Sequence, residues 1–251
     1  MNLFGTRALV TGGGRGIGRG ISLALARAGA DLCISYRARN DAATATAQEI
    51  RDLGQQAHIF QADMGNPADV QNLLDASVAT LGGIDIVVCN AGMHYRRPFL
   101  DISVEEWDEV LNADLRAPFL LGQAASRQMI AQGHGGRIIM ITSISAEVAY
   151  PNLVHYQAAK AGLKMLARGM ALELVEHGIT VNAVAPGVTL TDLSVDSLTD
   201  PVQREKRLGR IPMGRPGDPK DIGAAVAFIA SDQTEWMTGT TITVDGGQTV
   251  L

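Results

Sequence analysis

Short hydrophobic runs alternate with longer amphipathic stretches along most of the chain. The runs have the length expected of buried β-strands, and the stretches between them are long enough to form helices. We expect strands at residues 8–11, 31–36, 57–61, 84–89, 137–142, 180–185 and 240–244. We expect helices between them at about 17–29, 41–53, 67–80, 103–131, 152–177 and 218–231.

This alternation predicts a parallel sheet with helices on both faces. With right-handed crossovers, the fold class is α/β, a doubly wound, Rossmann-like three-layer sandwich forming one domain over residues 1–251. Such sheets bind ligands at the carboxyl ends of their strands, so the segments that follow the strands should line one site. The long irregular stretch 188–217 is either a substrate loop or a variable surface insertion.

A glycine-rich turn, TGGGRGIG at residues 11–18, follows the first predicted strand. Gly12, Gly16 and Gly18 permit a tight turn, close approach of the backbone to a pyrophosphate and close packing of the next helix. The amides near Ile17, at the start of that helix, favour a bound anion. The turn therefore predicts a dinucleotide site, although glycines in this pattern also occur in simple flexible turns.

The end of the second strand indicates which dinucleotide is preferred. An acidic residue there would bind the ribose 2′-hydroxyl of NAD, but the chain has Ser35, Tyr36 and Arg37 instead. Arg37 can stack on adenine and pair with a 2′-phosphate, assisted by Arg15. We predict a preference for NADP(H), with NAD accepted less well. A solvent-facing Arg37 is the alternative.

Other candidate cofactor contacts follow the remaining strands. Each would pass as an ordinary loop residue by itself, but all belong to the same predicted edge of the sheet. They are Asp63, Met64, Asn90, Ala91, Gly92, Pro186, Gly187, Val188 and Thr191.

Three residues suggest redox chemistry at a C–O centre. Tyr156 and Lys160 stand four apart in a predicted helix and share a face, and Ser143 ends a predicted strand. We expect the Lys160 ammonium and an oxidised nicotinamide to lower the pKa of the Tyr156 phenol from its usual value of about 10. The phenol would then exchange a proton with a substrate oxygen that Ser143 also binds, while hydride moves to or from nicotinamide. Tyr156 and Lys160 are also candidate cofactor contacts.

With these motifs, the chain resembles the short-chain dehydrogenase/reductase family over essentially its whole length. The matching residues are Gly12, Gly16, Gly18, Asp63, Asn90, Ala91, Gly92, Ser143, Tyr156, Lys160, Pro186 and Gly187, together with 237–239 and 244–247. The resemblance implies a single-domain Rossmann-like fold, a nicotinamide cofactor and a homotetramer.

The chain departs from the family pattern at one position. The family commonly has an asparagine in an Asn-Leu pair on the helix before Ser143, where it helps to hold a water in a proton relay to the lysine. The chain has Asp114-Leu115 there, and Asn112 lies about 200° around a regular helix from Asp114. We treat Asp114 as a candidate catalytic residue that accepts from the same water or pairs with Lys160.

Around this centre, His94 is a candidate substrate contact beside Ser143 and Tyr156. Glu147 and Tyr150 are further candidates for the pocket wall, whereas His155 is expected to pack or face solvent. The five histidines show no metal-ligand spacing, and we expect no metal site.

The substrate class remains open between several hypotheses. Similarity of 153–156, 200–201 and 211–214 to glucose 1-dehydrogenases favours an NADP-dependent oxidoreductase acting on a small carbonyl or alcohol substrate, such as a sugar or polyol. A 3-oxoacyl-[acyl-carrier-protein] reductase shares all the motifs, but the acidic Glu173 and Glu176 fit an acidic carrier protein poorly. A non-catalytic NADP-binding regulator is a third alternative.

Composition limits the partners and the compartment. The 251 residues carry a net charge of −5, which does not favour a nucleic-acid or anionic-membrane partner. No hydrophobic run is long enough to span a membrane, and the first strand begins too early for a signal peptide. Cys33 and Cys89 fall on strands that another strand should separate, which excludes a disulfide. We expect a soluble cytoplasmic protein.

Overall fold

The computed structural model describes residues 1–191, 205 and 208–250, and in this part of the chain seven parallel strands form one sheet. The strands are β1 (Arg7–Val10), β2 (Asp31–Tyr36), β3 (Ala57–Gln61), β4 (Ile86–Cys89), β5 (Gly136–Ile141), β6 (Ile179–Pro186) and β7 (Thr241–Val244). Their spatial order is β3-β2-β1-β4-β5-β6-β7. The winding direction reverses between β1 and β4, which is where doubly wound sheets bind ligands. The predicted fold class is confirmed.

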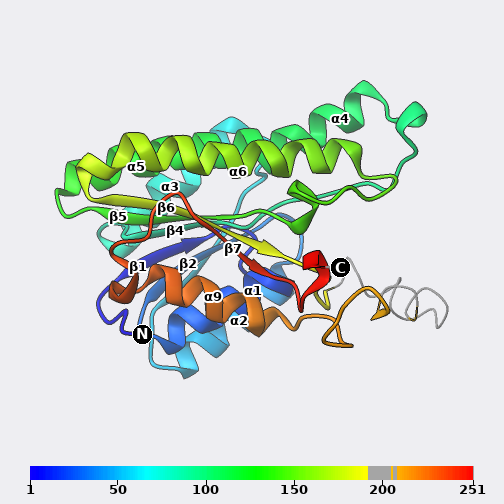
Figure 1. Cartoon of the computed structure of the whole chain (residues 1–251). Coiled ribbons are helices and arrows are strands. Elements are labelled where there is room, and N and C mark those ends of the chain that lie inside the picture. Colours follow the sequence, from blue (N-terminus) through cyan, green and yellow to red (C-terminus); the bar gives the residue numbers. More distant parts are fainter. Residues whose placement is uncertain (192–204, 206–207, 251) are drawn as a thin grey trace.

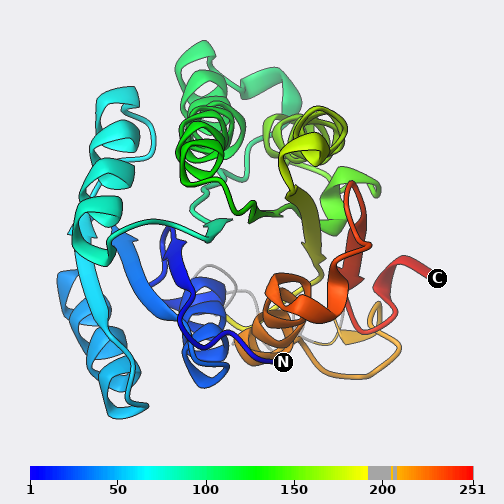
Figure 2. The same cartoon turned by 90° about the vertical axis from the view of Figure 1, so that its left-hand side faces the viewer.

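Helices cover both faces of the sheet (Figures 1 and 2). One layer consists of α1 (Gly16–Arg27), α2 (Asn40–Asp52) and α9 (Pro219–Ala230). The opposite layer consists of α3 (Pro67–Leu81), α4 (Val104–Leu111), α5 (Ala117–Gln132) and α6 (Val154–Leu174). The chain thus forms the three-layer sandwich that the alternating pattern predicts.

Strand β1 shows how the sequence divides the core between the two layers. Ala8 and Val10 pack with buried residues of α1 and α9, whereas Leu9 packs with buried residues of α3, α5 and α6. Successive side chains of a strand point to opposite faces of the sheet, and both faces of this sheet are covered. Continuous hydrophobic runs, rather than alternating ones, are therefore expected in the central strands.

The helix predicted at 103–131 is interrupted. Between α4 and α5 lies a π-helical turn, Asn112–Arg116, in which the Ala117 N–H donates to the Asn112 carbonyl. Pro118 has no N–H to donate in the first turn of α5, so a regular helix could not continue through this point with all its bonds. The expectation that Asn112 and Asp114 are related by regular helical geometry was therefore wrong. The turn places Asp114 in the interior, where its side chain is fully buried.

The two cysteines occupy separate strands, as predicted. Cys33 on β2 and Cys89 on β4 are buried and unpaired, and β1 lies between their strands.

Only the two ends of the predicted substrate loop are described. Leu190 donates its N–H to the Gly217 carbonyl over 2.8 Å, and Gly217 donates to the Val188 carbonyl over 2.9 Å. The ends of the loop are thus joined beside the carboxyl end of β6. Residues 192–204 and 206–207, including the pair at 200–201, lie outside the described residues.

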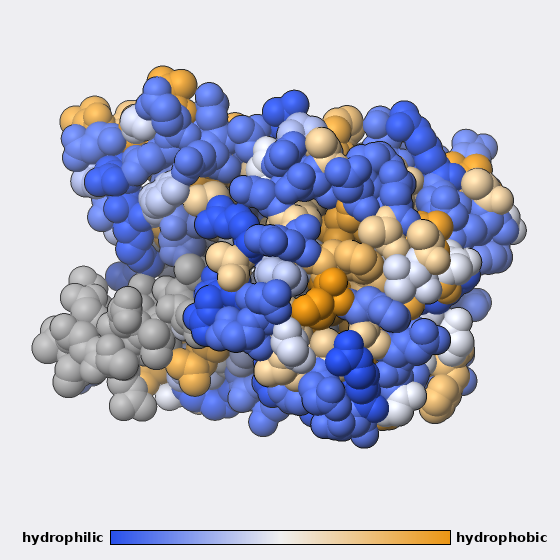
Figure 3. Space-filling view, turned by 180° about the vertical axis from the view of Figure 1, so that it is seen from behind, coloured by the Kyte–Doolittle hydropathy of each residue, from blue (hydrophilic) through white to orange (hydrophobic). Residues whose placement is uncertain are grey.

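The surface is mainly hydrophilic on the side opposite to the view of Figure 1, with a smaller hydrophobic area near its centre (Figure 3). Among the described residues, no helix has the length and hydrophobicity that a membrane crossing requires.

Candidate active site

The glycine turn connects β1 to α1 in the conformation that its sequence predicts. Gly12 and Gly16 have φ angles of 62° and 51°, in the left-handed region that favours glycine. A side chain on Gly18 would collide with the carbonyl of Gly12, so the helix can approach the turn this closely only without one. The Gly12 N–H donates to the Ser35 hydroxyl over 3.1 Å, which fixes the turn against β2.

Asn90 connects the same turn to β4. Its side-chain Nδ2 donates to the Thr11 carbonyl over 2.8 Å. In return, the Thr11 hydroxyl accepts from the N–H groups of Asn90 and Ala91. The Asn90-Ala91-Gly92 segment therefore braces the glycine turn as well as forming part of the wall beside it.

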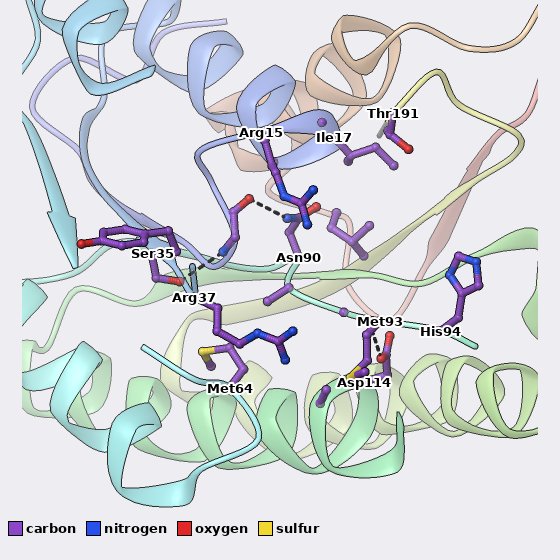
Figure 4. Close-up of a pocket in the computed structure, with 18 of the residues that line it drawn as sticks. Arg15, Ile17, Ser35, Arg37, Met64, Asn90, Met93, His94, Asp114 and Thr191 are labelled. Atoms are coloured by element: carbon purple, nitrogen blue, oxygen red, sulfur yellow. Dashed lines mark hydrogen bonds between the residues drawn. The ribbon is translucent and has the colours of Figure 1, made fainter. Parts of the chain in front are cut away.

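A cleft of about 560 Å³ opens at the carboxyl ends of the strands, with residues from several segments extending into it (Figure 4). All but one of the predicted catalytic, cofactor and substrate residues lie along it. Those lining it are Gly12, Arg15, Gly16, Ile17, Gly18, Tyr36, Arg37, Asp63, Met64, Asn90, Ala91, Gly92, His94, Asp114, Ser143, Tyr156, Lys160, Pro186, Gly187 and Thr191. Val188 does not line the cleft, and its N–H donates to the side chain of Gln248 over 3.2 Å.

Cationic side chains surround one end of the cleft. Arg15, at the start of α1, and Arg37, after β2, extend into the same space (Figure 4). Arg39 also lines it, a residue that the sequence reasoning missed, and its guanidinium pairs with Asp41 at 3.0 Å. The hydrogen bonds from the Arg39 guanidinium lower the pKa of the Asp41 carboxyl.

Ser143, Tyr156 and Lys160 meet at the other end of the cleft. Ser143 lies two residues after the end of β5, and the other two lie in the first two turns of α6. The Lys160 Nζ lies 5.6 Å from the centre of the Tyr156 ring and donates to the Ile141 carbonyl over 3.1 Å. The three predicted side chains are thus brought together.

Asp114 completes this cluster from the π-helical turn. Its Oδ1 lies 2.8 Å from Lys160 Nζ, and its Oδ2 accepts from the Met93 N–H over 2.8 Å. A side chain on residue 92 would collide with the Asp114 carboxylate. The loop can therefore pass this close to the ion pair only because residue 92 is a glycine. The predicted pairing of Asp114 with Lys160 is present.

The pKa of Tyr156 is set by opposing effects. Burial raises the pKa of the phenol, and the Asp114 carboxylate raises it further, while the Lys160 ammonium and the Ser143 hydroxyl lower it. In the protein alone the net shift is upward, because burial and Asp114 outweigh the expected lowering by Lys160. The more acidic phenol expected with an oxidised nicotinamide bound stays a prediction. Position in the sequence shows that Lys160 is near the phenol, but it shows neither the burial of the phenol nor the approach of Asp114.

The pKa of Lys160 is also raised. Burial lowers the pKa of its ammonium, but attraction to Asp114 and Tyr156 outweighs this effect. Lys160 therefore remains charged within the cleft.

The loop after β4 packs against the start of α6. The His94 ring centre lies 5.4 Å from that of Tyr156, and the Tyr95 ring stacks over His155 at 6.4 Å. His155 is fully buried, in agreement with a packing role. His94 lines the cleft next to the phenol, as its assignment as a substrate contact requires.

Two suggested wall residues do not line the cleft. Glu147 forms an ion pair with Lys164 at 2.6 Å, and the Tyr150 hydroxyl accepts from Gln248 over 3.1 Å. Proximity in the sequence to Ser143 and Tyr156 suggested both, but their partners direct them elsewhere.

Comparisons with known proteins agree on the family. The family model described as enoyl-(acyl carrier protein) reductase matches residues 12–249. The chain is 38% identical over 248 residues to an L-rhamnose 1-dehydrogenase (NAD(P)(+)) of Sphingomonas sp., covering 99% of this chain and 98% of that protein. It is 38% identical over 240 residues to a 3-oxoacyl-[acyl-carrier-protein] reductase of Staphylococcus aureus, covering 96% of each.

Solved structures give the same result. A protein of Agrobacterium tumefaciens assigned as a 2-deoxy-D-gluconate 3-dehydrogenase, with bound NADP, superposes with a TM-score of 0.92 at 33% identity, over 100% of this chain and 98% of that one. A 7α-hydroxysteroid dehydrogenase with NADH and 7-oxo-glycochenodeoxycholic acid superposes with a TM-score of 0.93 at 36% identity, over 98% and 95%. The chain belongs to the short-chain dehydrogenase/reductase family and is an oxidoreductase acting on CH–OH groups.

Proposed function

We propose that the protein is an NADP(H)-dependent oxidoreductase that interconverts a carbonyl and a secondary alcohol in a small polar substrate, a sugar or polyol. One observation carries the proposal. The glycine turn and the cluster of Ser143, Tyr156 and Lys160 line the same cleft, so a bound dinucleotide and a substrate oxygen would meet there.

The residues present fit a nicotinamide dinucleotide. Gly12, Gly16 and Gly18 line the cleft without side chains at the N-terminus of α1, where a pyrophosphate would bind. Asp63, Asn90 and the segment after β6 would hold the remainder of the molecule. When bound, the nicotinamide ring supplies or accepts the hydride.

The protein's own groups handle the proton and the charge on oxygen. Tyr156 would donate a proton to the carbonyl oxygen during reduction and take it back during oxidation. Ser143 would donate a hydrogen bond to the same oxygen and stabilise its developing charge. The Lys160 ammonium opposes the effect of burial on the phenol and so favours the phenolate that oxidation requires.

Asp114 acts in this proposal as a positioning residue. Its pairing with Lys160 and its bond from the Met93 N–H hold the ammonium beneath the phenol. Because the carboxylate is charged, it also raises the pKa of both neighbours, which an asparagine at this position would not do.

The preference for NADP(H) rests on charge around the cleft. Arg15, Arg37 and Arg39 supply cations where a 2′-phosphate would lie, and β2 ends in Tyr36 without a carboxylate. NAD remains a poorer cofactor in this proposal. The solved relatives include one with NADP and one with NADH, so the preference is to be decided by kinetics.

The polar substrate class is supported by His94. Its imidazole lies beside Tyr156 and can donate or accept a hydrogen bond next to the reacting oxygen. The relative that matches 99% of this chain is named for a sugar substrate, L-rhamnose.

A 3-oxoacyl-[acyl-carrier-protein] reductase is the second candidate, favoured by the relative of that name. The Glu109 carboxylate accepts from the hydroxyl of Tyr95, which lines the cleft, and its charge would oppose an acidic carrier protein. A non-catalytic NADP-binding regulator is the third.

We also propose a cytoplasmic homotetramer. Large apolar side chains are exposed on the outer helices and near β7, as a subunit interface would require. They include Val104, Phe119, Met165, Leu172, Val175 and Trp236. Light scattering would test the assembly, and unpaired Cys33 and Cys89 agree with a reducing compartment.

The experiment that tests the activity is a screen of NADPH oxidation and NADP reduction over aldehydes, ketones, ketoesters, sugars and polyols. We expect turnover with a free sugar or polyol to exceed that with a carrier-protein-linked ketoester. Faster turnover of the ketoester would favour the second candidate, and NADPH binding without turnover of any compound would favour the regulator.

A further inference from the structure

Gln248, near the C-terminus, joins two segments that belong to opposite sides of the site. Its Oε1 accepts from the Val188 N–H over 3.2 Å, and its Nε2 donates to the Tyr150 hydroxyl over 3.1 Å. The orientation of the amide is defined by chemistry, because a backbone N–H can only donate and must face the oxygen. The NH₂ group is then left for Tyr150.

The first of these segments borders the cleft on the cofactor side. Val188 follows Pro186 and Gly187, which line the cleft. The Gly187 N–H donates to the Val244 carbonyl over 2.9 Å, and a side chain on Gly187 would come within 3.1 Å of Gln248 Oε1. The loop after β6 is therefore packed directly on the C-terminal segment.

The second segment leads to the catalytic helix. The Tyr150 carbonyl accepts from Gln157 Nε2 over 3.0 Å, and Gln157 directly follows Tyr156 in the first turn of α6. A continuous set of hydrogen bonds thus runs from Val188 through Gln248 and Tyr150 to the residue beside the catalytic phenol.

The C-terminal segment, residues 245–249, is held in one conformation by internal hydrogen bonds. The Asp245 carboxylate accepts from the N–H groups of Gly247 and Thr249 and from the Thr249 hydroxyl, over 2.7–2.9 Å. Met213 donates its N–H to the Gly246 carbonyl over 3.1 Å, which ties the end of the substrate loop to the same segment.

We propose that Gln248 is a positioning residue that fixes the distance between the loop after β6 and the first turn of α6. This inference rests on the proposed function, since those two segments carry the cofactor side and the catalytic phenol. Gln248 does not line the cleft and acts only through Val188 and Tyr150.

The test compares Gln248→Met, which preserves length and removes both hydrogen bonds, with Thr249→Val as a matched control. Thr249→Val removes the hydroxyl bond to Asp245 in the same segment, but it keeps the two N–H bonds to that carboxylate and both hydrogen bonds of Gln248. We expect Gln248→Met to lower kcat/KM about tenfold, mainly through kcat, and to weaken NADPH binding measured by fluorescence. Thr249→Val should leave both quantities unchanged even if its Tm falls equally.

Two further variants separate positioning from general stability. The double variant Gln248→Met/Tyr150→Phe should lose no more activity than the worse of the two single variants. Each single change already breaks the same connection between the two segments. Gln248→Glu should recover most of the activity, because its carboxylate can accept from both the Val188 N–H and the Tyr150 hydroxyl.

The outcomes distinguish this inference from the proposed function. If Gln248→Met is as active as the wild type, or if the activity losses of the two single variants multiply in the double variant, the positioning role is overturned. The proposed function is not affected by either result. If the wild type turns over no substrate, the proposed function fails. NADPH affinity then still decides, because an unchanged Kd in Gln248→Met overturns the positioning role and a raised Kd supports it.

Discussion

Lys160 and Asp114 form a buried ion pair with 2.8 Å between Nζ and Oδ1, at the point where the helix after β4 is widened by a π-helical turn. Asp114 is fully buried and Lys160 nearly so. Two charges so close in the interior stabilise each other, and removal of either leaves the other without its partner. The pair therefore determines the charge beneath the phenol of Tyr156.

Replacement of Asp114 by asparagine tests that electrostatic role. Asn preserves the shape and can still accept from the Met93 N–H, but it removes the charge that raises the pKa of Tyr156 and Lys160. Both pKa values should fall. The limb of the pH profile that reports phenol ionisation in alcohol oxidation should consequently shift to lower pH.

Asp114→Ala should be more damaging than Asp114→Asn. It leaves the Lys160 ammonium buried without its partner, and breaking such a pair costs about 3–5 kcal/mol of stability. Chemical denaturation measures that loss, and kcat/KM as a function of pH measures the effect on catalysis. An unchanged rate and pH profile in Asp114→Ala would remove this residue from the mechanism.

Removal of the Tyr156 hydroxyl should abolish most of the chemistry without loss of the cofactor. Tyr156→Phe keeps the ring that packs against His94 but cannot transfer a proton, so kcat should fall about 10²–10⁴-fold. NADPH titration by fluorescence should give a Kd close to that of the wild type. Undiminished turnover in this variant would contradict the assignment of Tyr156 as the acid and base.

Arg37 should determine the choice between the two dinucleotides. In Arg37→Ala, KM for NADPH should rise about tenfold or more because a charge-assisted contact to the 2′-phosphate is lost, whereas KM for NADH should change little. Arg19→Ala is the matched control, since Arg19 is on α1 and pairs with exposed Glu49 away from the cleft. A wild-type kcat/KM for NADH equal to or above that for NADPH would contradict the preference.

The fold could be predicted because strands that are buried on both faces of a sheet need continuous hydrophobic runs. Runs such as that around Leu9 must be apolar throughout, and the glycines at 12, 16 and 18 are required by φ angles and close contacts. The strands and the cleft residues follow from these local requirements. The predicted strand ends coincide with the observed ones or differ from them by at most two residues.

The features that the sequence alone could not predict depend on neighbours distant along the chain. Pro118 marks the break between α4 and α5, but nothing local shows that the resulting turn buries Asp114. The pKa of Tyr156 depends on burial and on that carboxylate, and both become known only when α6 packs against the turn. Val188 was assigned from its position after β6, whereas Gln248, sixty residues later, determines where its N–H points.

The acid stability of the protein should depend on His155. Its ring is fully buried, and neither nitrogen has a hydrogen-bond partner among the described residues. Burial lowers the pKa of His155 and Arg97 lowers it further, while Glu106 and Asp114 oppose the shift, and the net change is downward. Below a pH of about 6.5, the unfolded chain therefore binds the proton more tightly than the folded protein does. The stability that the neutral ring confers is complete above that pH and is lost as the pH falls towards the folded pKa.

His155→Leu removes this titration, so its Tm should fall less than the wild-type Tm between about pH 7 and pH 5.5. His177→Leu is the matched control, because His177 lies near Glu176 with a side chain that is 40% exposed. That variant should keep the wild-type dependence on pH. Equal slopes of Tm against pH in the wild type and His155→Leu would show that acid destabilises the fold through other groups.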